Sequence, residues 1–326
     1  MTHAPSLPRT SNSAAQNSPE PPQHKASPLR RRRRPLHSRT AYLLILPALA
    51  IFGIFSLGPA VFTLIISTFD WNWLNVSQSE FIGPENYQDM LSGAGTPSFW
   101  HTLWVTAQFV GAIVVLGTVI SLALAMLLRH ATALSLFGRA AVFIAFVTPQ
   151  VATSIAWIWM YNDRFGVLNA MLQMVGLPRI DWLGSPTYAM AAVVIYTLWQ
   201  GMGFTMMIFL GGLTTISQEL SQAAKVDGCN AFQEFWHVTL PQLRPFVLFV
   251  VIITSINSLQ AFTQFFVMTS GGPGQSFATA TLGFEVYRQA FVSRETGYAA
   301  ALAVVLFAIT AALAVAQFRM NRRINR

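Results

Sequence analysis

Charged residues are scarce in this chain. Only 10% of its 326 residues are Asp, Glu, Lys or Arg, while 53% are hydrophobic and the mean hydropathy is +0.49. Soluble domains carry about 25% charged residues. The composition therefore excludes one large soluble core and predicts a polytopic membrane protein of the all-α class.

Residues that commonly catalyse reactions or bind metals are also few. Cys229 is the single cysteine, which excludes an intrachain disulfide and a thiolate metal cluster, and the six histidines show no metal-ligand spacing. The sequence contains no HExxH motif, no GxSxG motif and no glycine-rich phosphate loop. We therefore expect no catalytic site, metal or cofactor in this chain, and no ATP hydrolysis by a phosphate loop of its own.

The first 40 residues differ from the rest of the chain. They are rich in Ser, Pro, Gln and His and end in a basic cluster formed by Arg30–Arg34 and Arg39. Such a segment cannot bury enough apolar surface to fold. The apolar run that follows, residues 41–67, is longer than the roughly 7–15 residues of a signal-peptide core. We expect a disordered cytoplasmic tail at 1–40, whose arginines act as an orientation anchor rather than as a nucleic-acid patch.

Six apolar segments are each long enough for a membrane-spanning helix of about 20 residues. They lie at about 41–67, 101–128, 139–161, 188–212, 245–269 and 298–318. Their cores contain no charged residue, and their internal Gly and Pro residues are tolerable because neighbouring helices in a bundle satisfy the freed backbone groups. The sequence thus predicts a transmembrane domain over 41–326.

Basic residues are distributed unevenly between the two sides of these spans. With the N-terminus inside, only four of the 20 Lys and Arg residues fall outside, namely Arg164, Arg179, Arg288 and Arg294. Acidic residues show the opposite bias. The positive-inside rule then places both termini in the cytoplasm, which agrees with an even number of spans.

A polar segment, Glu219–Pro241, separates the fourth and fifth apolar segments. Ser217 can cap a first helix and Gly228 can end it in a left-handed conformation. Asn230 can cap a second helix, and we expect Pro241 to stop it. A helix lying on anionic lipid would be rich in Lys and Arg, whereas this segment has Lys225 against Glu219, Asp227 and Glu234. We therefore predict an amphipathic cytoplasmic hairpin that contacts a soluble protein partner.

The spacing within this hairpin is similar to a known family signature. Ala223-Ala224, then Gly228, then Val238–Pro241 resembles the EAA signature of ABC importer permeases, with nine residues between Gly228 and Val238. Other segments resemble the carbohydrate-uptake branch of importers similar to those for maltose and glycerol 3-phosphate: Phe81–Gly83, Asn86-Tyr87, Trp182-Leu183, Thr269–Pro273, Tyr287 and Phe291. The resemblance covers about residues 41–326.

The resemblance implies that the loop at 213–244 couples this chain to an ATPase. The residues that it assigns to this contact are Glu219, Gln222, Ala223, Ala224, Asp227, Gly228, Leu240 and Pro241. Gln222 stands where the signature has Glu, an acid thought to pair with a basic residue of the ATPase. Gln222 keeps hydrogen bonding but loses the charge, so we expect either Glu219, one turn earlier, or the sister permease to supply an acid.

The resemblance also implies a half-transporter in the bacterial cell membrane. The chain would pair with a second, homologous permease, two cytosolic ATP-binding subunits and an extracytoplasmic solute-binding protein, surrounded by lipid and without nucleic acid. ATP and Mg would be bound by the ATPase subunits. Closure of the ATPases would swing the helices and open the solute site outward, because the hairpin makes different contacts in the two ATPase states.

Polar side chains inside spans are costly unless they face a cavity or another helix. In the fifth span, Asn257, Gln260 and Gln264 follow one another at i+3 and i+4 steps and are expected on one face of one helix. Amides can bond sugar hydroxyls, and aromatic rings can cover apolar sugar faces. The residues predicted to line a solute path are Asn257, Gln260, Gln264, Phe265, Tyr196, Trp199 and Gln200. Hydrogen bonding between helices is their alternative role.

The resemblance points to a sugar, an oligosaccharide or glycerol 3-phosphate as the solute. A phosphate would favour Arg or Lys, and the absence of both from the span cores favours a neutral sugar. Three other functions stay open on the residues alone. An ion-coupled secondary transporter usually has ionisable residues in its spans, a membrane scaffold or receptor subunit needs no polar stripe, and a lipid enzyme needs a catalytic pair, although His101 and His237 have no evident partner.

Overall fold

In the computed structural model of the chain, residues 38–324 are described, with the exception of residues 74 and 273. The disordered tail predicted at 1–40 lies outside the described residues, apart from residues 38–40. The chain divides into two units, Met1–Phe52 and Gly53–Arg326.

The first unit contains helix α1 (Ser38–Phe52), which is apolar after its first turn and includes Pro47. The second unit begins with a π-helical turn at Gly53–Leu57, followed by α2 (Gly58–Ile66). Along the chain, Leu43–Ile66 is a helical run of 24 residues that contains an 18-residue stretch with a mean hydropathy of 2.3. This run is long enough for the first predicted span, since a bilayer requires about 20 residues.

Helices make up most of the second unit. Its longer helices are α4 (Phe99–Leu127), α5 (Ala133–Val147), α8 (Pro186–Thr214), α11 (Leu240–Leu259) and α14 (Thr296–Ile324). Its shorter helices are α3 (Glu85–Ser92), α6 (Gln150–Met160), α7 (Val167–Met174), α9 (Gln218–Val226), α10 (Ala231–Glu234), α12 (Thr263–Met268) and α13 (Leu282–Tyr287). Two short strands, β1 (Phe69–Asp70) and β2 (Glu80–Phe81), pair antiparallel with Phe69 opposite Phe81.

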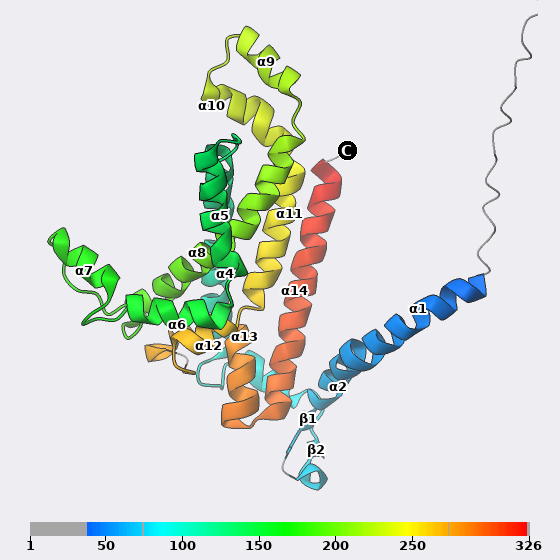
Figure 1. Ribbon diagram of the computed structural model, residues 1–326. Coiled ribbons are helices and arrows are strands. Elements are labelled where there is room, and N and C mark those ends of the chain that lie inside the picture. The colour runs from blue at the N-terminus through cyan, green and yellow to red at the C-terminus, as the bar shows by residue number, and fades with distance from the viewer. Residues whose placement is uncertain (1–37, 74, 273, 325–326) are drawn as a thin grey trace, which may run out of the picture. The chain divides into compact units, whose positions relative to one another are not determined.

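The core of the second unit is a bundle of upright helices (Figure 1). Helix α4 packs against α8 and α11, α5 packs against α8, and α14 packs against α11 and α2. Helices α9 and α10 form a hairpin at the end of the bundle where α14 terminates, while α13 and the paired strands lie at the opposite end. The hairpin and the C-terminal end of α14, both predicted to be cytoplasmic, thus share one end of this unit.

Small residues allow the helices of the bundle to approach closely. A Cβ atom at Gly203 of α8 would lie 2.6 Å from the carbonyl oxygen of Val142 on α5, so a larger residue at this position would force the two helices apart. Between α4 and α8, the hydroxyls of Ser121 and Thr205 share a hydrogen bond of 2.5 Å. Both features are typical of helix packing in membranes.

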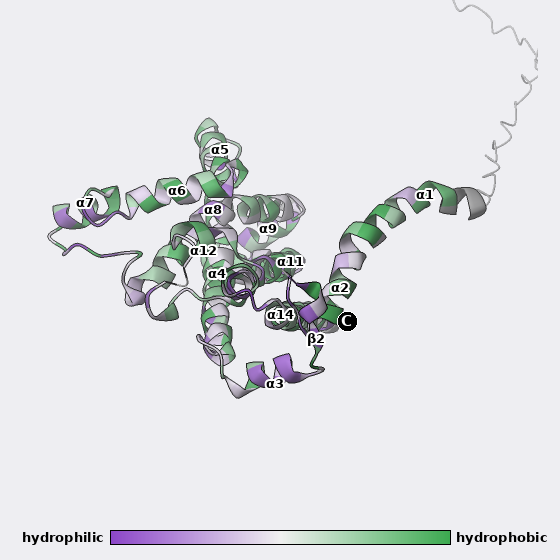
Figure 2. Cartoon of the chain, turned by 90° about the horizontal axis from the view of Figure 1, so that it is seen from below, coloured by the Kyte–Doolittle hydropathy of each residue, from purple (hydrophilic) through white to green (hydrophobic). Residues whose placement is uncertain are grey.

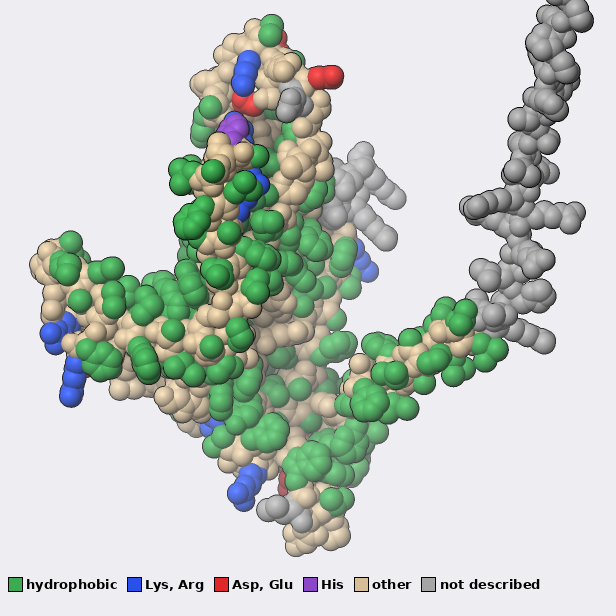
Figure 3. All heavy atoms as spheres, viewed as in Figure 1, with side chains coloured by type: hydrophobic (Ala, Val, Ile, Leu, Met, Phe, Trp, Pro, Cys, Tyr) green, Lys and Arg blue, Asp and Glu red, His purple; other side chains and the backbone are tan. Residues whose placement is uncertain are grey.

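The surface of the second unit is hydrophobic along the bundle and more polar at its ends. In Figure 2 hydrophilic residues colour much of α3, whereas the long helices are mainly hydrophobic. Figure 3 shows Lys, Arg, Asp and Glu side chains near the hairpin, beside α7 and at the end opposite the hairpin, whereas hydrophobic side chains cover most of the bundle between them. A bundle with an apolar flank and polar ends is the arrangement that a bilayer requires.

Five helical runs among the described residues are long and apolar enough to cross a membrane, and the bent pair of α5 and α6 would bring the number to six. The predicted all-α membrane fold is confirmed. The third predicted span, 139–161, is not straight, because α5 and α6 meet at an angle of 102°. Pro149 lacks an N–H and disfavours helical backbone at Thr148, which is extended with φ −71° and ψ 136°. Pro149 therefore ends one helix and precedes another, whereas the sequence analysis expected a continuous span to tolerate it.

Candidate functional site

Local capping interactions build the hairpin of α9 and α10. The hydroxyl of Ser217 accepts a hydrogen bond of 3.2 Å from the backbone two residues later, at the start of α9. Gly228 follows α9 with a left-handed φ of +80°. The N–H groups of Gly228 and Cys229 donate to the carbonyls of Lys225 and Ala224, which is a Schellman motif. The predicted serine cap and glycine turn are confirmed.

The second half of the hairpin agrees with the sequence analysis only in part. Asn230 and Gln233 form the expected capping box, in which each side chain accepts a hydrogen bond from the other residue's backbone N–H. Pro241, however, does not stop the helix, because it lies in the first turn of α11, where an N–H is not needed. A π-helical turn at Phe235–Thr239 joins α10 to α11. One helical run therefore extends over Ala231–Leu259.

The residues that the resemblance assigns to ATPase coupling lie in α9, its C-terminal turn and the start of α11. Glu219, Gln222, Ala223, Asp227 and Gly228 are exposed, Leu240 and Pro241 are half-buried, and Ala224 is buried. The exposed members include a carboxylate, an amide and a small side chain within one turn of α9. This face is polar and open to a protein partner, whereas Ala224 packs inside the hairpin.

A hydrogen bond that the sequence analysis did not predict joins the two helices of the hairpin. Oγ of Ser221 on α9 donates to Oε1 of Glu234 on α10 at 2.5 Å. Ser221, Gln222 and Glu234 border a cavity of about 450 Å³ between the hairpin and the connection from α4 to α5. Arg139 also borders this cavity and donates two hydrogen bonds to the carbonyl of Leu128, the residue that follows α4. The acid that shares a cavity with Gln222 is therefore Glu234, whereas Glu219 is exposed.

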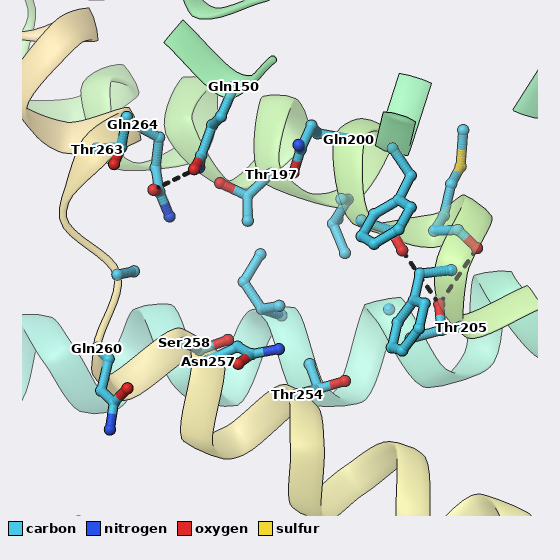
Figure 4. Close-up of a pocket in the computed structure, with 18 of the residues that line it drawn as sticks. Gln150, Thr197, Gln200, Thr205, Thr254, Asn257, Ser258, Gln260, Thr263 and Gln264 are labelled. Atoms are coloured by element: carbon cyan, nitrogen blue, oxygen red, sulfur yellow. Dashed lines mark hydrogen bonds between the residues drawn. The ribbon is translucent and has the colours of Figure 1, made fainter. Parts of the chain in front are cut away.

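A second cavity, of about 380 Å³, lies among α4, α5, α6, α8, α11 and α12, and we call it the central cavity. Its polar lining is Gln150, Thr197, Gln200, Thr205, Thr254, Asn257, Ser258, Gln260, Thr263 and Gln264 (Figure 4). None of the residues that line it is charged. The central cavity thus offers hydrogen-bond donors and acceptors to a polar molecule without offering it a counter-ion.

The central cavity borders an interruption of the fifth predicted span. Helices α11 and α12 are separated by Gln260–Phe262, and Phe262 has a non-helical backbone with φ −134° and ψ −54°. The three amides of this span therefore do not follow one face of a single helix, as expected for a continuous helix at 245–269. No proline or glycine lies at the break, so helix propensity alone does not indicate it.

One hydrogen bond joins the two broken spans at the central cavity. Nε2 of Gln150, in the first turn of α6, donates to Oε1 of Gln264, in the first turn of α12, at 2.8 Å (Figure 4). Gln264 is only 4% exposed. Helices α6 and α12 also pack against each other. The bend at Pro149 and the break at Gln260–Phe262 therefore bring two amides from distant parts of the chain into contact.

The four amides predicted to line a solute path occupy two settings. Asn257, Gln200 and Gln264 border the central cavity. Gln260 also borders a smaller cavity of about 250 Å³ against α14, and its side chain points away from the other labelled amides in Figure 4. The break after α11 thus turns Gln260 away from the set that the sequence placed on one face.

The three aromatic residues predicted for the path pack beside the central cavity and do not line it. Tyr196 is fully buried, and its hydroxyl donates to the carbonyl of Gln150 at 2.9 Å. Phe265 is fully buried in the same apolar cluster, and Trp199 packs against that cluster. These rings support the wall of the cavity, which is the structural role that their burial indicates.

Three residues that line the central cavity were not predicted: Gln150, Thr197 and Thr263. For Gln150 the signal was present in Pro149, because a proline that ends one helix makes the next residue part of the first turn of another. Gln150 was instead taken as an interior residue of a continuous span. No comparable signal marks Thr197 or Thr263, whose place depends on the packing of α8 and α12.

The chemistry that these two regions allow is binding. Among the described residues, no group of three or more His, Cys, Asp or Glu side chains could hold a metal ion. The central cavity combines amides and hydroxyls with the rings of Phe146, Phe204 and Phe262. This mixture suits a molecule with both hydroxyl groups and apolar faces. The hairpin, at the other end of α11, offers an exposed polar surface to a protein.

Comparison with known proteins agrees with this picture. A family model described as "Binding-protein-dependent transport system inner membrane component" matches residues 96–326. The sulfoquinovosyl glycerol transport system permease protein SmoG of Agrobacterium fabrum is 32% identical over 282 residues, which is 86% of this chain and 90% of SmoG. The trehalose/maltose transport system permease protein MalF of Thermococcus litoralis is 30% identical over 291 residues, which is 87% of this chain and 94% of MalF.

A solved structure shares the fold. It is a chain from the crystal structure of a bacterial ABC transporter involved in the import of the acidic polysaccharide alginate, with a TM-score of 0.77 and 19% identity, covering 89% of this chain and 97% of that chain. These findings do not favour a secondary transporter, a scaffold or a lipid enzyme. The chain belongs to the family of inner membrane components of binding-protein-dependent transport systems, as a non-catalytic subunit with several membrane-spanning helices.

Proposed function

We propose that this chain is one of two permease subunits of an ATP-driven importer for an uncharged sugar or oligosaccharide. The observation that carries the proposal is the central cavity, whose polar lining consists of amide and hydroxyl groups. The names of two relatives support a neutral saccharide, whereas the name of SmoG supports only a sugar-containing solute. Besides MalF, a probable starch degradation products transport system permease protein, AmyD of Thermoanaerobacterium thermosulfurigenes, is 30% identical over 282 residues, 86% of this chain and 94% of AmyD.

A neutral solute fits the central cavity better than an acidic one. Arginine and lysine are the side chains that bind carboxylate and phosphate groups most strongly. Neither type borders the central cavity, whereas Arg129, Arg139 and Lys225 all border the cavity beneath the hairpin. The half of the solute path that this chain supplies therefore favours a neutral saccharide over an acidic polysaccharide or glycerol 3-phosphate.

The amides of the cavity account for recognition of hydroxyl groups. Each glutamine or asparagine side chain offers two N–H donors and an acceptor oxygen. Gln264 uses its oxygen to accept from Gln150, which leaves its own N–H groups for a solute. Asn257 and Gln200 approach the same space from α11 and α8. A sugar hydroxyl both donates and accepts, so it can bond any of these groups.

The hairpin is the proposed docking site for a cytosolic ATP-binding subunit, which would hold ATP and Mg. Glu219, Gln222 and Ala223 would contact that subunit, because they are exposed on α9. The helical run Ala231–Leu259 connects the hairpin directly to the break that borders the central cavity. A movement of the hairpin on ATP binding would therefore shift one wall of the cavity, and the difference in contact between the two ATPase states would drive it.

The proposed orientation places both termini and the hairpin in the cytoplasm. The distribution of Lys and Arg along the sequence supports it. The position of the hairpin and the C-terminal end of α14 at one end of the second unit is consistent with it. A solute-binding protein would then deliver the sugar at the end where α13 lies, and a second permease would complete the path.

The test is uptake by the complete complex in proteoliposomes, with its solute-binding protein added outside. Maltose and trehalose serve as neutral probes and an alginate oligosaccharide serves as an acidic probe. We expect a neutral probe to stimulate both ATP hydrolysis and uptake. Stimulation by the acidic probe alone would contradict a neutral solute, and failure of any ATP-binding subunit to co-purify would contradict the coupling role of the hairpin.

A pair of matched variants tests the coupling surface itself. Ala223→Asp places a charge on the exposed face of α9, and we expect it to abolish stimulation or to release the ATP-binding subunits. Ala231→Asp places the same charge on an exposed residue of α10, where the helix N-terminus favours an acid. Equal loss in both variants would show that the effect is not specific to the predicted contact.

A further inference from the structure

Four aromatic rings form a continuous row beside the central cavity, and we call them the aromatic row: Phe262, Phe266, Tyr287 and Phe291. The ring of Phe291 lies 5.1 Å from that of Tyr287, centre to centre. Tyr287 in turn lies 5.0 Å from Phe262 and 5.1 Å from Phe266. Phe262 and Phe266 are stacked at 5.4 Å. Tyr287, Phe262 and Phe266 thus contact one another, and Phe291 extends this group on the side of Tyr287.

The aromatic row has one end at the surface and the other at the central cavity. Phe291 is 70% exposed, while the other three rings are half-buried. Phe262 borders the central cavity. Phe291 belongs to a π-helical turn, Arg288–Ser293, that follows α13 at the end of the second unit opposite the hairpin (Figure 1). The row therefore leads from the proposed extracytoplasmic end into the cavity.

The backbone explains why the rings align. The pairs Phe262 with Phe266, and Tyr287 with Phe291, are each four residues apart, which places each pair on one side of its helical segment. The break before α12 brings Phe262 to the cavity. The loop after α12 lies close against the row, since a Cβ atom at Gly271 would be 3.4 Å from Cε2 of Phe266.

The charge beside the aromatic row is already paired. Arg288 follows Tyr287 in the chain, forms an ion pair with Glu285 and donates to the carbonyl of Thr96 at 2.8 Å. The hydrogen bond to Glu285 raises the pKa of Arg288 above its ordinary value. Glu285 itself is only 2% exposed. What the row offers a solute is therefore the faces of its rings rather than the charge of Arg288.

Rings in series suit a saccharide in transit. The apolar faces of a sugar, where C–H bonds point outward, pack on aromatic rings, while its hydroxyls remain hydrated. From the surface to the cavity, Phe291, Tyr287 and Phe262 offer three successive contacts, with Phe266 beside the last two. Contacts of similar strength let a sugar pass from one ring to the next without binding any of them tightly. The central cavity, with its amides, then supplies the hydrogen bonds that the row lacks.

We propose that the aromatic row is the entry track by which a saccharide moves from the binding protein to the central cavity, with Phe291 as the first ring that it meets. This inference rests on the proposed function, because the stacking argument requires a sugar. The other role that exposed aromatic residues commonly have at this depth is anchoring in the lipid–water boundary. An aromatic anchor supports insertion of the complex, so its loss lowers the yield and the basal ATP hydrolysis of the complex together with uptake, whereas loss of a stacking track lowers uptake alone.

The test separates these roles by exchanging the ring of Phe291 and by measuring the yield and basal ATP hydrolysis of each variant, which an anchor would change and the entry track would not. Phe291→Leu keeps apolar bulk but removes the ring, and Phe291→Tyr keeps the ring. Uptake of maltose and trehalose, delivered by the binding protein to the complete complex in proteoliposomes, is measured as kcat/KM. We expect Phe291→Leu to lower kcat/KM about three- to tenfold, the range of one aromatic contact, and Phe291→Tyr to stay near wild type.

Phe165→Leu is the matched control, since Phe165 is 73% exposed and lies outside the aromatic row. Phe165→Leu should leave uptake unchanged. If Phe291→Leu transports as well as Phe165→Leu, or if Phe291→Tyr fails as badly as Phe291→Leu, the entry track is wrong while the proposed function stands. If the wild-type complex transports neither sugar, the proposed function fails and the entry track fails with it.

Discussion

Gln150 and Gln264 are 114 positions apart in the chain, and a hydrogen bond of 2.8 Å joins them at the central cavity. Each lies in the first turn of a helix that starts after a break, α6 after the bend at Pro149 and α12 after Gln260–Phe262. The bond therefore ties together two spans that are both interrupted. A movement of α11 that reshapes the cavity has to keep this contact or break it.

Removal of the hydrogen bond between Gln150 and Gln264 should lower the stability of the protein. We expect Gln150→Leu and Gln264→Leu each to lower the free energy of unfolding, and a double-mutant cycle to give a coupling of about 0.5–1 kcal/mol, as for other hydrogen bonds between helices in membranes. Unfolding of the purified complex in a detergent titration measures it. A cycle of Gln200→Leu with Gln264→Leu is the control, since no direct bond joins that pair. Equal coupling in the two cycles would refute the assignment.

The central cavity could be predicted from the sequence only in part. Amide side chains are costly in apolar spans, so their presence predicted residues that line a solute path. Asn257, Gln200 and Gln264 do border the central cavity. Their geometry could not be predicted, because the break at Gln260–Phe262 carries no proline or glycine and depends on tertiary packing. Residues that came from other spans, such as Thr197, were missed for the same reason.

Gly228 sets the angle of the hairpin, because its φ of +80° is open to few residues other than glycine. We expect Gly228→Val to cost about 1–2 kcal/mol in local strain and to reduce uptake more than ATP hydrolysis by the reconstituted complex, since α9 would be misplaced on its partner. Gly228→Asn is the control, because asparagine tolerates the left-handed conformation. A Gly228→Val complex with wild-type uptake per ATP would argue against the hairpin as the coupling element.

Two acidic residues, Glu219 and Glu234, are candidates to replace the signature's Glu, whose position is occupied by Gln222. Glu234 holds α9 to α10 through Ser221, whereas Glu219 is exposed on α9. If the bond to Ser221 positions the hairpin, Ser221→Ala and Glu234→Gln should each lower ATPase stimulation by the loaded binding protein about two- to tenfold, which corresponds to the roughly 0.5–1.5 kcal/mol of a net intramolecular hydrogen bond. If Glu219 replaces the missing acid in the contact, Glu219→Gln should lower it instead. Stimulation that none of the three variants changes would contradict both roles.

The hairpin was more predictable than the cavity because its signals are local. A serine cap, a glycine turn and a capping box each depend on residues within a few positions, and all three are present as expected. The prediction that Pro241 stops the second helix was wrong, because a proline is compatible with the first turn of a helix as well as with the end of one. The bond between Ser221 and Glu234 crosses from one helix to the next, so no local pattern could indicate it.

The closest backbone approach that Gly203 makes is to α5, and it gives a sharp test of the bundle. An alanine at 203 would place its Cβ atom 2.6 Å from the carbonyl oxygen of Val142 and 2.9 Å from Cα of Phe143. Because those are backbone atoms, α5 would have to move, and we expect Gly203→Ala to lower the free energy of unfolding by about 1–3 kcal/mol. Gly211→Ala on the same helix, where nothing lies within 4 Å, should be neutral or stabilising. Thermal unfolding of the two purified variants measures the difference in stability between them. Equal stability would mean that α5 and α8 are not packed this tightly.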